Sequence, residues 1–288
     1  MASHKSFFGP GIQEIGWMGV LFFSFASYFP SFDIQSKVCE SVIIFKVDLK
    51  YLNIVDTFKY SFTDRCWIKP KKGRVILMDW TMLLLAGGKS SRMGVNKALL
   101  TIGGVVNVSR VASELKKVSE NIMVITNTFE EYHFLQLPLI PDLHKDQGPL
   151  GGLHAGLTSS KTELQFLAAC DMPFVSADAI KDIISHYEPE FDAVIPEING
   201  RLQPLFAVYH KRCLPVLTEC LLKQELKMSL FLEKISVKIM KETDFKLYCE
   251  NPEHFQYLFF NMNTREDYQE AGYIDQTELY IKDGRHEL

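Results

Sequence analysis

Residues 83–100 read LLLAGGKSSRMGVNKALL, and this stretch decides both the fold class and the kind of ligand. An apolar run ends at two adjacent glycines, which is typical of a short buried strand followed by a turn. Three cations, Lys89, Arg92 and Lys97, follow within the next ten residues. Glycines allow a backbone to approach a phosphate closely, and cations neutralise a polyphosphate. The stretch therefore predicts a phosphate-binding loop, although a strand-to-helix turn with solvated lysines is the alternative.

Two common phosphate motifs do not fit this loop. A P-loop needs a glycine where Leu83 stands, and a dinucleotide G-x-G-x-x-G is absent because Gly87 and Gly88 are adjacent. The stretch instead resembles the signature L-A-G-G-x-x-x-R-M-G-x-x-K of the nucleotidyltransferase superfamily. Within that superfamily, residues 78–272 resemble the molybdenum cofactor guanylyltransferases of the MobA family.

The composition limits the class of protein. The chain has 288 residues, of which 47% are hydrophobic and 23% charged, as in ordinary globular proteins. The net charge of −4 argues against a nucleic-acid partner, so local cations must bind an anionic substrate. None of the six cysteines forms a C-x-x-C pair, which argues against a zinc site or a redox dithiol. We expect a cytoplasmic protein with reduced thiols and without membrane association.

Residues 1–77 differ from the rest of the chain. Their apolar stretch at residues 17–29 is shorter than the roughly 20 residues of a transmembrane helix, and no A-x-A cleavage site follows it. We expect a loosely packed extension without a catalytic role, and one interpretation is that it is not translated in the native protein, with Met78 as the first residue. A membrane or partner anchor is the alternative.

From residue 78 to residue 288, strand and helix patterns alternate. Strands are expected at residues 82–86, 122–126, 164–169, 193–195, 205–209 and 256–261. Helices are expected at residues 107–118, 130–135, 150–159, 177–187, 212–223, 228–234 and 264–271, with Ser176 as one N-cap and Thr264 and Asp267 in capping-box spacing. This alternation predicts a Rossmann-like three-layer α/β/α nucleotidyltransferase domain with a mostly parallel sheet, preceded by an irregular N-terminal extension. Ligands of such sheets bind beyond the carboxyl ends of the strands.

Asp171 closes an apolar strand and is followed by Pro173, so its carboxylate is placed to hold a hard cation. Mg²⁺ prefers one or two carboxylates together with phosphate oxygens and water. On local sequence alone, a helix-capping aspartate is the alternative. The resemblance implies that this C-D-x-P segment holds Mg²⁺, and that Cys170 is a buried neighbour rather than a nucleophile.

Two further segments carry nucleotide-binding candidates. The loop GPLGG, which contains Gly151, opens a helix and allows a ligand to lie against its N-terminus. The resemblance implies that Asp142 and Gly151 lie beside guanine and ribose, and that Asn127 contacts the nucleotide. The flanking histidines His144 and His154 are interpreted as surface or packing residues.

The segment N-M-N-T at residues 261–264 has two amides that point the same way if the chain is extended. Alone it is a weak signal that also fits helix capping, but the resemblance implies that Asn263 joins Asp171 near the metal and the phosphates. The same resemblance assigns Gln203-Pro204-Leu205 to the acceptor side. Asn96 departs from the family pattern, because many relatives carry aspartate before the signature lysine, and an amide cannot form an ion pair with Lys97.

The resemblance implies that the chain transfers GMP from GTP to molybdenum-molybdopterin, releases pyrophosphate and forms the guanine dinucleotide cofactor. Mg²⁺ on Asp171 is the expected cofactor, Lys97 is expected at the α-phosphate, and Arg92 and Lys89 are expected at the outer phosphates. The expected backbone contacts to the base and donor come from Leu85, Ala86, Gly87 and Gly88. Molybdoenzyme maturation proteins are further partners that this activity allows.

Three alternatives stay open. A sister family transfers CMP to the same pterin, but it usually has two alanines in place of Gly87 and Gly88. A sugar-phosphate or polyol-phosphate nucleotidyltransferase shares the first motif but fewer of the later ones. A nucleotide-binding regulatory module without catalysis is the non-enzyme alternative, and the intact Lys97, Asp171 and Asn263 argue against it.

Overall fold

The computed structural model describes residues 34–39, 42–47, 66–68, 74–87, 96–144 and 146–282. The candidates Gly88, Lys89 and Arg92 and the apolar stretch at residues 17–29 therefore lie outside the described residues. No helix of the described part is long and apolar enough to span a membrane.

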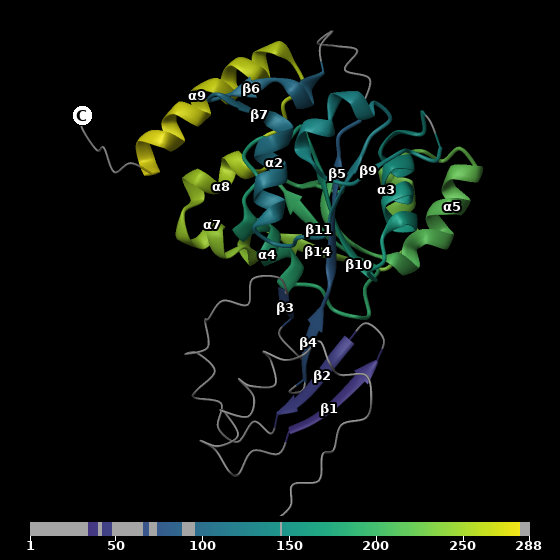
Figure 1. Cartoon of the computed structure of the whole chain (residues 1–288). Helices are drawn as coiled ribbons and strands as arrows, with labels where there is room; N and C mark the ends of the chain where they lie inside the picture. Colours follow the sequence, from purple (N-terminus) through teal and green to yellow (C-terminus); the bar gives the residue numbers. More distant parts are fainter. Residues whose placement is uncertain are drawn as a thin grey trace, which may run out of the picture.

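An eight-stranded sheet forms the centre of the chain from residue 80 onward (Figure 1). Its order is β12-β11-β13-β10-β5-β8-β9, and β14 pairs with β11. The bounds are β5 Trp80–Leu85, β8 Ile122–Ile125, β9 Leu139–Ile140, β10 Leu164–Ala169, β11 Ala193–Ile198, β12 Arg201–Leu202, β13 Phe206–His210 and β14 Val237–Lys241. The pairs β10–β5, β5–β8, β8–β9 and β11–β14 are parallel, whereas β13 and β12 run antiparallel to their neighbours. The predicted mostly parallel sheet is confirmed.

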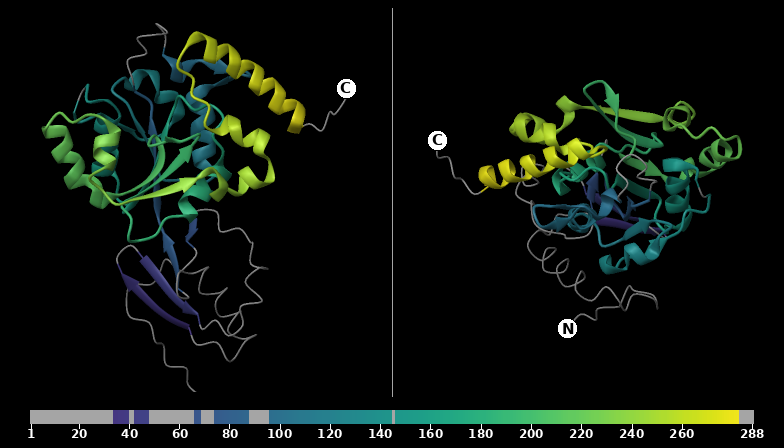
Figure 2. Two further views of the ribbon diagram at one scale, coloured as in Figure 1. Left: turned by 180° about the vertical axis from the view of Figure 1, so that it is seen from behind. Right: turned by 90° about the horizontal axis from the view of Figure 1, so that it is seen from above.

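Helices cover both faces of this sheet, as Figures 1 and 2 show. The helices are α2 Asn107–Lys116, α3 Gly148–Ser159, α4 Ala177–Ser185, α5 Leu214–Leu222, α6 Met228–Leu232, α7 Lys246–Glu250, α8 Pro252–Leu258 and α9 Arg265–Lys282. One core cluster joins the sheet to α2, α4 and α8, and a second joins it to α3, α5 and α6. Successive residues of β5 alternate between the two clusters, with Met82 and Leu84 in the first and Leu83 and Leu85 in the second. This two-sided burial explains why β5 is continuously apolar from Met82 to Leu85.

Short elements complete the domain. A hairpin of β6 Thr101–Ile102 and β7 Val105–Val106 precedes α2, and α9 lies beside it (Figure 1). Tyr268 of α9 donates its hydroxyl to the Thr101 carbonyl at 2.8 Å, and Arg110 of α2 forms an ion pair with Asp275 of α9 at 2.7 Å. The 3₁₀ turns are η2 Lys97–Leu99, η3 Phe129–Glu131, η4 His133–Leu135, η5 Lys211–Cys213 and η6 Glu242–Asp244.

The described part of the N-terminal segment consists of strands. The strands β1 Ile34–Cys39, β2 Val42–Val47, β3 Cys66–Ile68 and β4 Arg74–Met78 form an antiparallel sheet in the order β1-β2-β4-β3. The sequence analysis expects an irregular extension, and these strands are the regular structure found within it. β4 is followed directly by Asp79 and β5, so the extension leads into the first strand of the main sheet.

The sequence predictions and the structure differ at several elements. The strand expected at residues 256–261 is wrong, because residues 252–258 form helix α8. The aromatic composition favours a strand, but the buried Phe255, Leu258 and Phe259 recur at helical spacing, and packing of that face prevails. The helix expected at residues 130–135 is replaced by the turns η3 and η4. β14 was not predicted, because two lysines interrupt its short apolar pattern.

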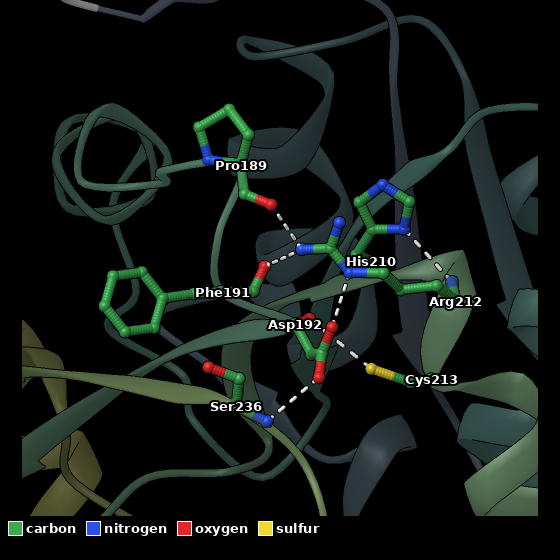
Figure 3. A network of polar contacts seen from close by, with 7 residues as sticks. All are labelled: Pro189, Phe191, Asp192, His210, Arg212, Cys213 and Ser236. Atoms are coloured by element: carbon green, nitrogen blue, oxygen red, sulfur yellow. Dashed lines mark hydrogen bonds and ion pairs between the residues drawn. The ribbon is translucent and has the colours of Figure 1, made fainter. Parts of the chain in front are cut away.

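A polar network secures the amino ends of β11 and β14 (Figure 3). Arg212 donates to the Asp192 carboxylate, to the Phe191 carbonyl and, at 2.7 Å, to the Pro189 carbonyl. Asp192 also accepts a hydrogen bond from the Ser236 backbone at 2.9 Å. Because Asp192 precedes β11 and Ser236 precedes β14, the network lies at the edge opposite the carboxyl ends of the parallel strands. It stabilises the sheet and is separate from the candidate site.

Close packing of α3 on β5 depends on Gly156, and this gives a stability prediction. A Cβ added at Gly156 would lie 2.5 Å from Cδ1 of Leu83, which is fully buried. We expect Gly156→Ala to lower the free energy of unfolding by about 1–3 kcal/mol through overpacking. Gly272→Ala in α9 is the matched control, because no described residue beyond its chain neighbours and its own helix backbone lies within 4 Å of its added Cβ, and we expect it to stabilise by up to about 1 kcal/mol. Urea unfolding followed by circular dichroism measures both, and an equal gain from the two alanines would contradict the packing argument.

Candidate active site

The carboxyl ends of four neighbouring parallel strands gather most of the described candidates. Leu85, Ala86 and Gly87 stand at the end of β5, Asn127 follows β8, Asp142 follows β9, and Asp171 follows β10. Backbone hydrogen bonds outside the regular strand pairing also connect these strand ends. Ala86 N donates to the Ile125 carbonyl at 3.0 Å, and Cys170 N donates to the Leu85 carbonyl at 3.1 Å. The site therefore lies at the edge of the sheet where the α/β rule predicts it.

Lys97 and Asn263 meet at this edge although they are far apart in the sequence. Lys97 opens the turn η2, and its Nζ donates to Asn263 Oδ1 at 3.0 Å. Asn263 stands in the irregular segment between α8 and α9, next to Met262, whose backbone N donates to the Asp171 carbonyl at 2.8 Å. The structure thus brings three predicted residues, Lys97, Asp171 and Asn263, into one cluster.

Asp171 has the electrostatic character of a cation ligand. Its Oδ1 is buried and accepts no hydrogen bond from the part of the chain that the structure describes. Burial raises the pKa of this carboxyl, while its backbone hydrogen bond and the Lys97 ammonium act to lower the same pKa. A buried carboxylate oxygen without a partner is costly for the fold. A bound cation would remove that cost.

The side chains at this cluster fit a hard divalent cation. Asp171 offers a carboxylate and Asn263 an amide oxygen, and both are oxygen donors of the kind that Mg²⁺ takes. Among the described residues there is no group of three or more His, Cys, Asp or Glu side chains able to hold a metal. Mg²⁺ characteristically binds through one or two protein ligands and completes its shell with phosphates and water. The donor set therefore suits a metal that arrives with a nucleotide.

Asn127, Asp142 and Gly151 form a second cluster. Asp142 N donates to Asn127 Oδ1 at 3.0 Å, which joins the ends of β8 and β9. A Cβ added at Gly151 would lie 2.9 Å from both Asp142 carboxylate oxygens, so only glycine allows α3 to approach this carboxylate. Burial raises the pKa of Asp142, while the His144 backbone N–H, which donates to its Oδ1 at 3.0 Å, acts to lower it.

The cysteine and histidines next to the site have packing contacts and no feature of a catalytic group. Burial and the negative charge of Asp171 raise the pKa of the Cys170 thiol to about 12, so the thiol is protonated at neutral pH. His154 pairs its Nε2 with the Thr218 hydroxyl at 3.1 Å, and its ring stacks edge-on against His144 with centroids 4.9 Å apart. Burial lowers the pKa of His154. These contacts agree with the packing role expected for both histidines.

Asn96 connects the lysine to the segment that follows β8. Its Oδ1 accepts a hydrogen bond from Ala98 N at 3.1 Å, which caps the turn that begins at Lys97. Its Nδ2 donates to the Glu131 carboxylate at 2.5 Å and to the Tyr132 hydroxyl at 2.9 Å. An aspartate at this position would place a second carboxylate against Glu131. The asparagine that replaces the usual aspartate therefore has a suitable neighbour, because its Nδ2 can donate to the Glu131 carboxylate.

Two supporting residues were not predicted as part of the site. Asp267 accepts hydrogen bonds from Asn263 N at 2.6 Å and Thr264 N at 2.7 Å, while its own N donates to the Thr264 hydroxyl at 3.1 Å. The predicted capping box is confirmed, and it also holds the Asn263 backbone. Although partial burial acts to raise the Asp267 pKa, these hydrogen bonds prevail and lower it. Asn107 is the second such residue: it has zero exposure, and its Nδ2 donates to the Cys170 carbonyl at 2.6 Å.

Gln203-Pro204-Leu205 lies between β12 and β13. Phe206, the first residue of β13, pairs with Ala168 near the carboxyl end of β10, which places the segment at the same edge of the sheet. Gln203 N donates to the Pro196 carbonyl at 2.8 Å, and the Tyr209 hydroxyl donates to the Pro204 carbonyl at 2.7 Å. The backbone of the segment is thereby held rigidly beside the cluster.

Comparison with known proteins finds related sequences. The family model described as "MobA-like NTP transferase domain" matches residues 82–237. A protein of Desulfosudis oleivorans named "Molybdenum cofactor guanylyltransferase" is 35% identical over 206 residues, covering 71% of this chain and 97% of that protein. A protein of Carboxydothermus hydrogenoformans named "Probable molybdenum cofactor guanylyltransferase" is 33% identical over 193 residues, covering 67% of this chain and 95% of that protein.

A solved structure shows the same fold. The molybdopterin-guanine dinucleotide biosynthesis protein A of Archaeoglobus fulgidus superposes with a TM-score of 0.60 at 25% identity, covering 68% of this chain and 99% of that chain. The family match spans the glycine-rich loop, strands β8, β9 and β10 and the site residues from Leu85 to Asp171, whereas Asn263 lies beyond it. The chain belongs to the family of MobA-like NTP transferases.

Proposed function

We propose that this protein transfers GMP from GTP to molybdenum-molybdopterin, releasing pyrophosphate and forming the guanine dinucleotide cofactor. The observation that carries this proposal is the cluster of Lys97, Asn263 and Asp171 at the carboxyl edge of the sheet. The names of the relatives from Desulfosudis oleivorans and Carboxydothermus hydrogenoformans supply the choice of donor and acceptor.

The reaction needs alignment and charge neutralisation more than proton transfer. A terminal phosphate oxygen of the acceptor forms a bond to the α-phosphorus of GTP, and the bond from that phosphorus to the bridging oxygen of pyrophosphate breaks. The acceptor phosphate is already an anion, so no strong general base is required. Lys97 would act on the charge that grows at the α-phosphate, and in the structure its Nζ donates to Asn263 Oδ1 at 3.0 Å.

Asp171 and Asn263 would hold the Mg²⁺, which when bound neutralises phosphate charge and orients donor and acceptor. We assign the outer phosphates to Lys89 and Arg92 and the nucleoside to Asn127, Asp142 and Gly151, as the sequence analysis expects. The backbone from Leu85 to Gly88 would contact the base. We further propose that residues 78–288 form the catalytic domain, because every assigned residue follows Met78.

Gly87 supports the assignment of the base site. It is exposed, and among the described residues a Cβ added to it would meet only ordinary contacts, the Ile125 carbonyl and Thr126 Cα at 3.8 Å each. Packing against the described part of the chain therefore does not require a glycine here. A nucleotide lying against the exposed backbone gives a reason for the missing side chain.

The nucleotide choice is tested by binding and by product release. With Mg²⁺ present, we expect GTP to bind about 10²-fold more tightly than ATP, because the wrong base would leave buried polar groups unpaired. Thermal-shift titrations with GTP, ATP, CTP and UTP measure the ranking, and pyrophosphate release in the presence of molybdenum-molybdopterin measures the transfer. Equal stabilisation by CTP and GTP would refute the guanine assignment. Tight GTP binding without release of pyrophosphate would identify a binding module instead of an enzyme.

A further inference from the structure

Asn107 is a buried polar side chain placed directly behind the proposed metal ligand. It is the first residue of α2 and has 0% exposure. Its Nδ2 donates to the Cys170 carbonyl at 2.6 Å. Its Oδ1 is buried and accepts no hydrogen bond from the residues that the structure describes. Burying the amide while its oxygen lacks a hydrogen-bond donor costs free energy. A buried asparagine at this position therefore calls for a functional explanation.

Three hydrogen bonds hold the backbone of Cys170 and Asp171. Cys170 N donates to the Leu85 carbonyl of β5 at 3.1 Å, and the Asp171 carbonyl accepts from Met262 N at 2.8 Å. The third contact is the bond from Asn107 to the Cys170 carbonyl. The carbonyl groups before and after the Asp171 Cα thus both accept hydrogen bonds, which fix the two peptide planes from which its side chain projects.

The same segment of chain carries Asn107 at one end and Lys97 at the other. Between them, η2 and the β6–β7 hairpin form a closed unit, because Asn107 N donates to the Leu100 carbonyl at 2.8 Å. A bond from Asn107 to Cys170 therefore sets the position of this whole unit relative to the end of β10. It acts on the separation between the Lys97 cation and the Asp171 carboxylate.

We propose that Asn107 is a positioning residue that holds the Cys170 carbonyl so that the Asp171 carboxylate faces Lys97 and a nucleotide-bound divalent cation. This inference rests on the proposed function. Asn107 acts through Asp171 and touches no reacting atom. The role resembles that of outer-shell partners at metal sites, whose loss typically weakens metal binding about 10–100-fold.

Gln165 provides a matched control. It lies near the amino end of β10, the strand whose carboxyl end leads to Cys170 and Asp171. It has 0% exposure and donates its Nε2 to the Thr162 carbonyl at 2.6 Å. Its Oε1, like Asn107 Oδ1, is buried without a partner among the described residues. The two amides share burial, bond length and an unsatisfied oxygen, and only Asn107 adjoins the proposed metal ligand.

The test measures metal binding without turnover. Full-length wild type, Asn107→Leu, Gln165→Leu and Asp171→Asn are titrated with Mn²⁺ in the presence of a GTP analogue that carries a methylene between its α- and β-phosphates. We expect both leucine variants to lower Tm by several degrees, because each leaves a backbone carbonyl without its amide donor. We expect Asn107→Leu alone to weaken Mn²⁺ binding by about tenfold or more. Asn107→Ser, whose hydroxyl is too short for the full contact, gives the same comparison if the leucine variant fails to fold.

The outcomes separate the two proposals. Weakened Mn²⁺ binding in Asp171→Asn with unchanged binding in the folded Asn107 variants would overturn the positioning role and leave the proposed function intact. Equal Mn²⁺ binding by wild type and Asp171→Asn would overturn the metal assignment, and the role of Asn107 with it. A comparable loss in Gln165→Leu would show that general destabilisation, not position, governs binding.

Discussion

Asp171→Asn is expected to lower turnover by about 10²-fold or more while the protein stays folded. An amide lacks the charge that a hard cation needs, and removal of one central electrostatic stabiliser has an effect of this size. Pyrophosphate release measured over a range of Mg²⁺ concentrations tests the expectation. Asp182→Asn is a control, because Asp182 is also a buried carboxylate but accepts its hydrogen bond from Lys246 N at 2.7 Å, away from the site.

The same substitution should stabilise the metal-free protein. Burial raises the pKa of Asp171, which means that the folded state disfavours the charged carboxylate relative to the unfolded state. A neutral amide removes that penalty, so Tm measured at pH 7 in a chelator is expected to rise. Near-normal turnover at low Mg²⁺, or a fall in this Tm, would contradict the assignment of Asp171.

Lys97→Ala is expected to reduce kcat by about 10²–10³-fold, which corresponds to roughly 3–4 kcal/mol of transition-state stabilisation. The cation is held by Asn263 at 3.0 Å and faces the site, so it is placed to act on charge that develops at the α-phosphate. A group directed at the transition state changes kcat more than KM. Steady-state kinetics of the alanine and arginine variants, with GTP varied, provide the measurement.

Lys181→Ala is the matched control for this prediction. Lys181 is an exposed lysine of α4 with only a long contact of 3.8 Å to Asp178, and its removal is expected to change neither parameter. If KM for GTP rises in Lys97→Ala while kcat is preserved, the lysine binds GTP in the ground state, and its proposed role in stabilising the transition state is wrong.

Regular periodicity explains the parts of the fold that were predictable. The strand predicted at residues 164–169 has the bounds of β10, and the predicted N-cap Ser176 accepts from Ala179 N at 3.2 Å. Each such prediction depends on residues within one turn or one strand of each other. Residues 256–261 failed because their aromatic composition and their spacing favour different structures, and only the core that receives Phe255 and Leu258 decides between them.

The sequence by itself determined the alternation of the main strands and helices, the family, and the edge of the sheet at which the candidates lie. Local patterns suffice for this, because parallel strands place their carboxyl ends together. The tertiary structure decided the partners: Lys97 with Asn263 across 166 positions, and Asn107 with Cys170 across 63. Hydrogen bonds over such separations follow from how α2, α9 and the sheet pack, and no local pattern encodes them. Gly151 was predicted as a nucleotide contact, and only its distance to Asp142 shows that the fold also requires a glycine there.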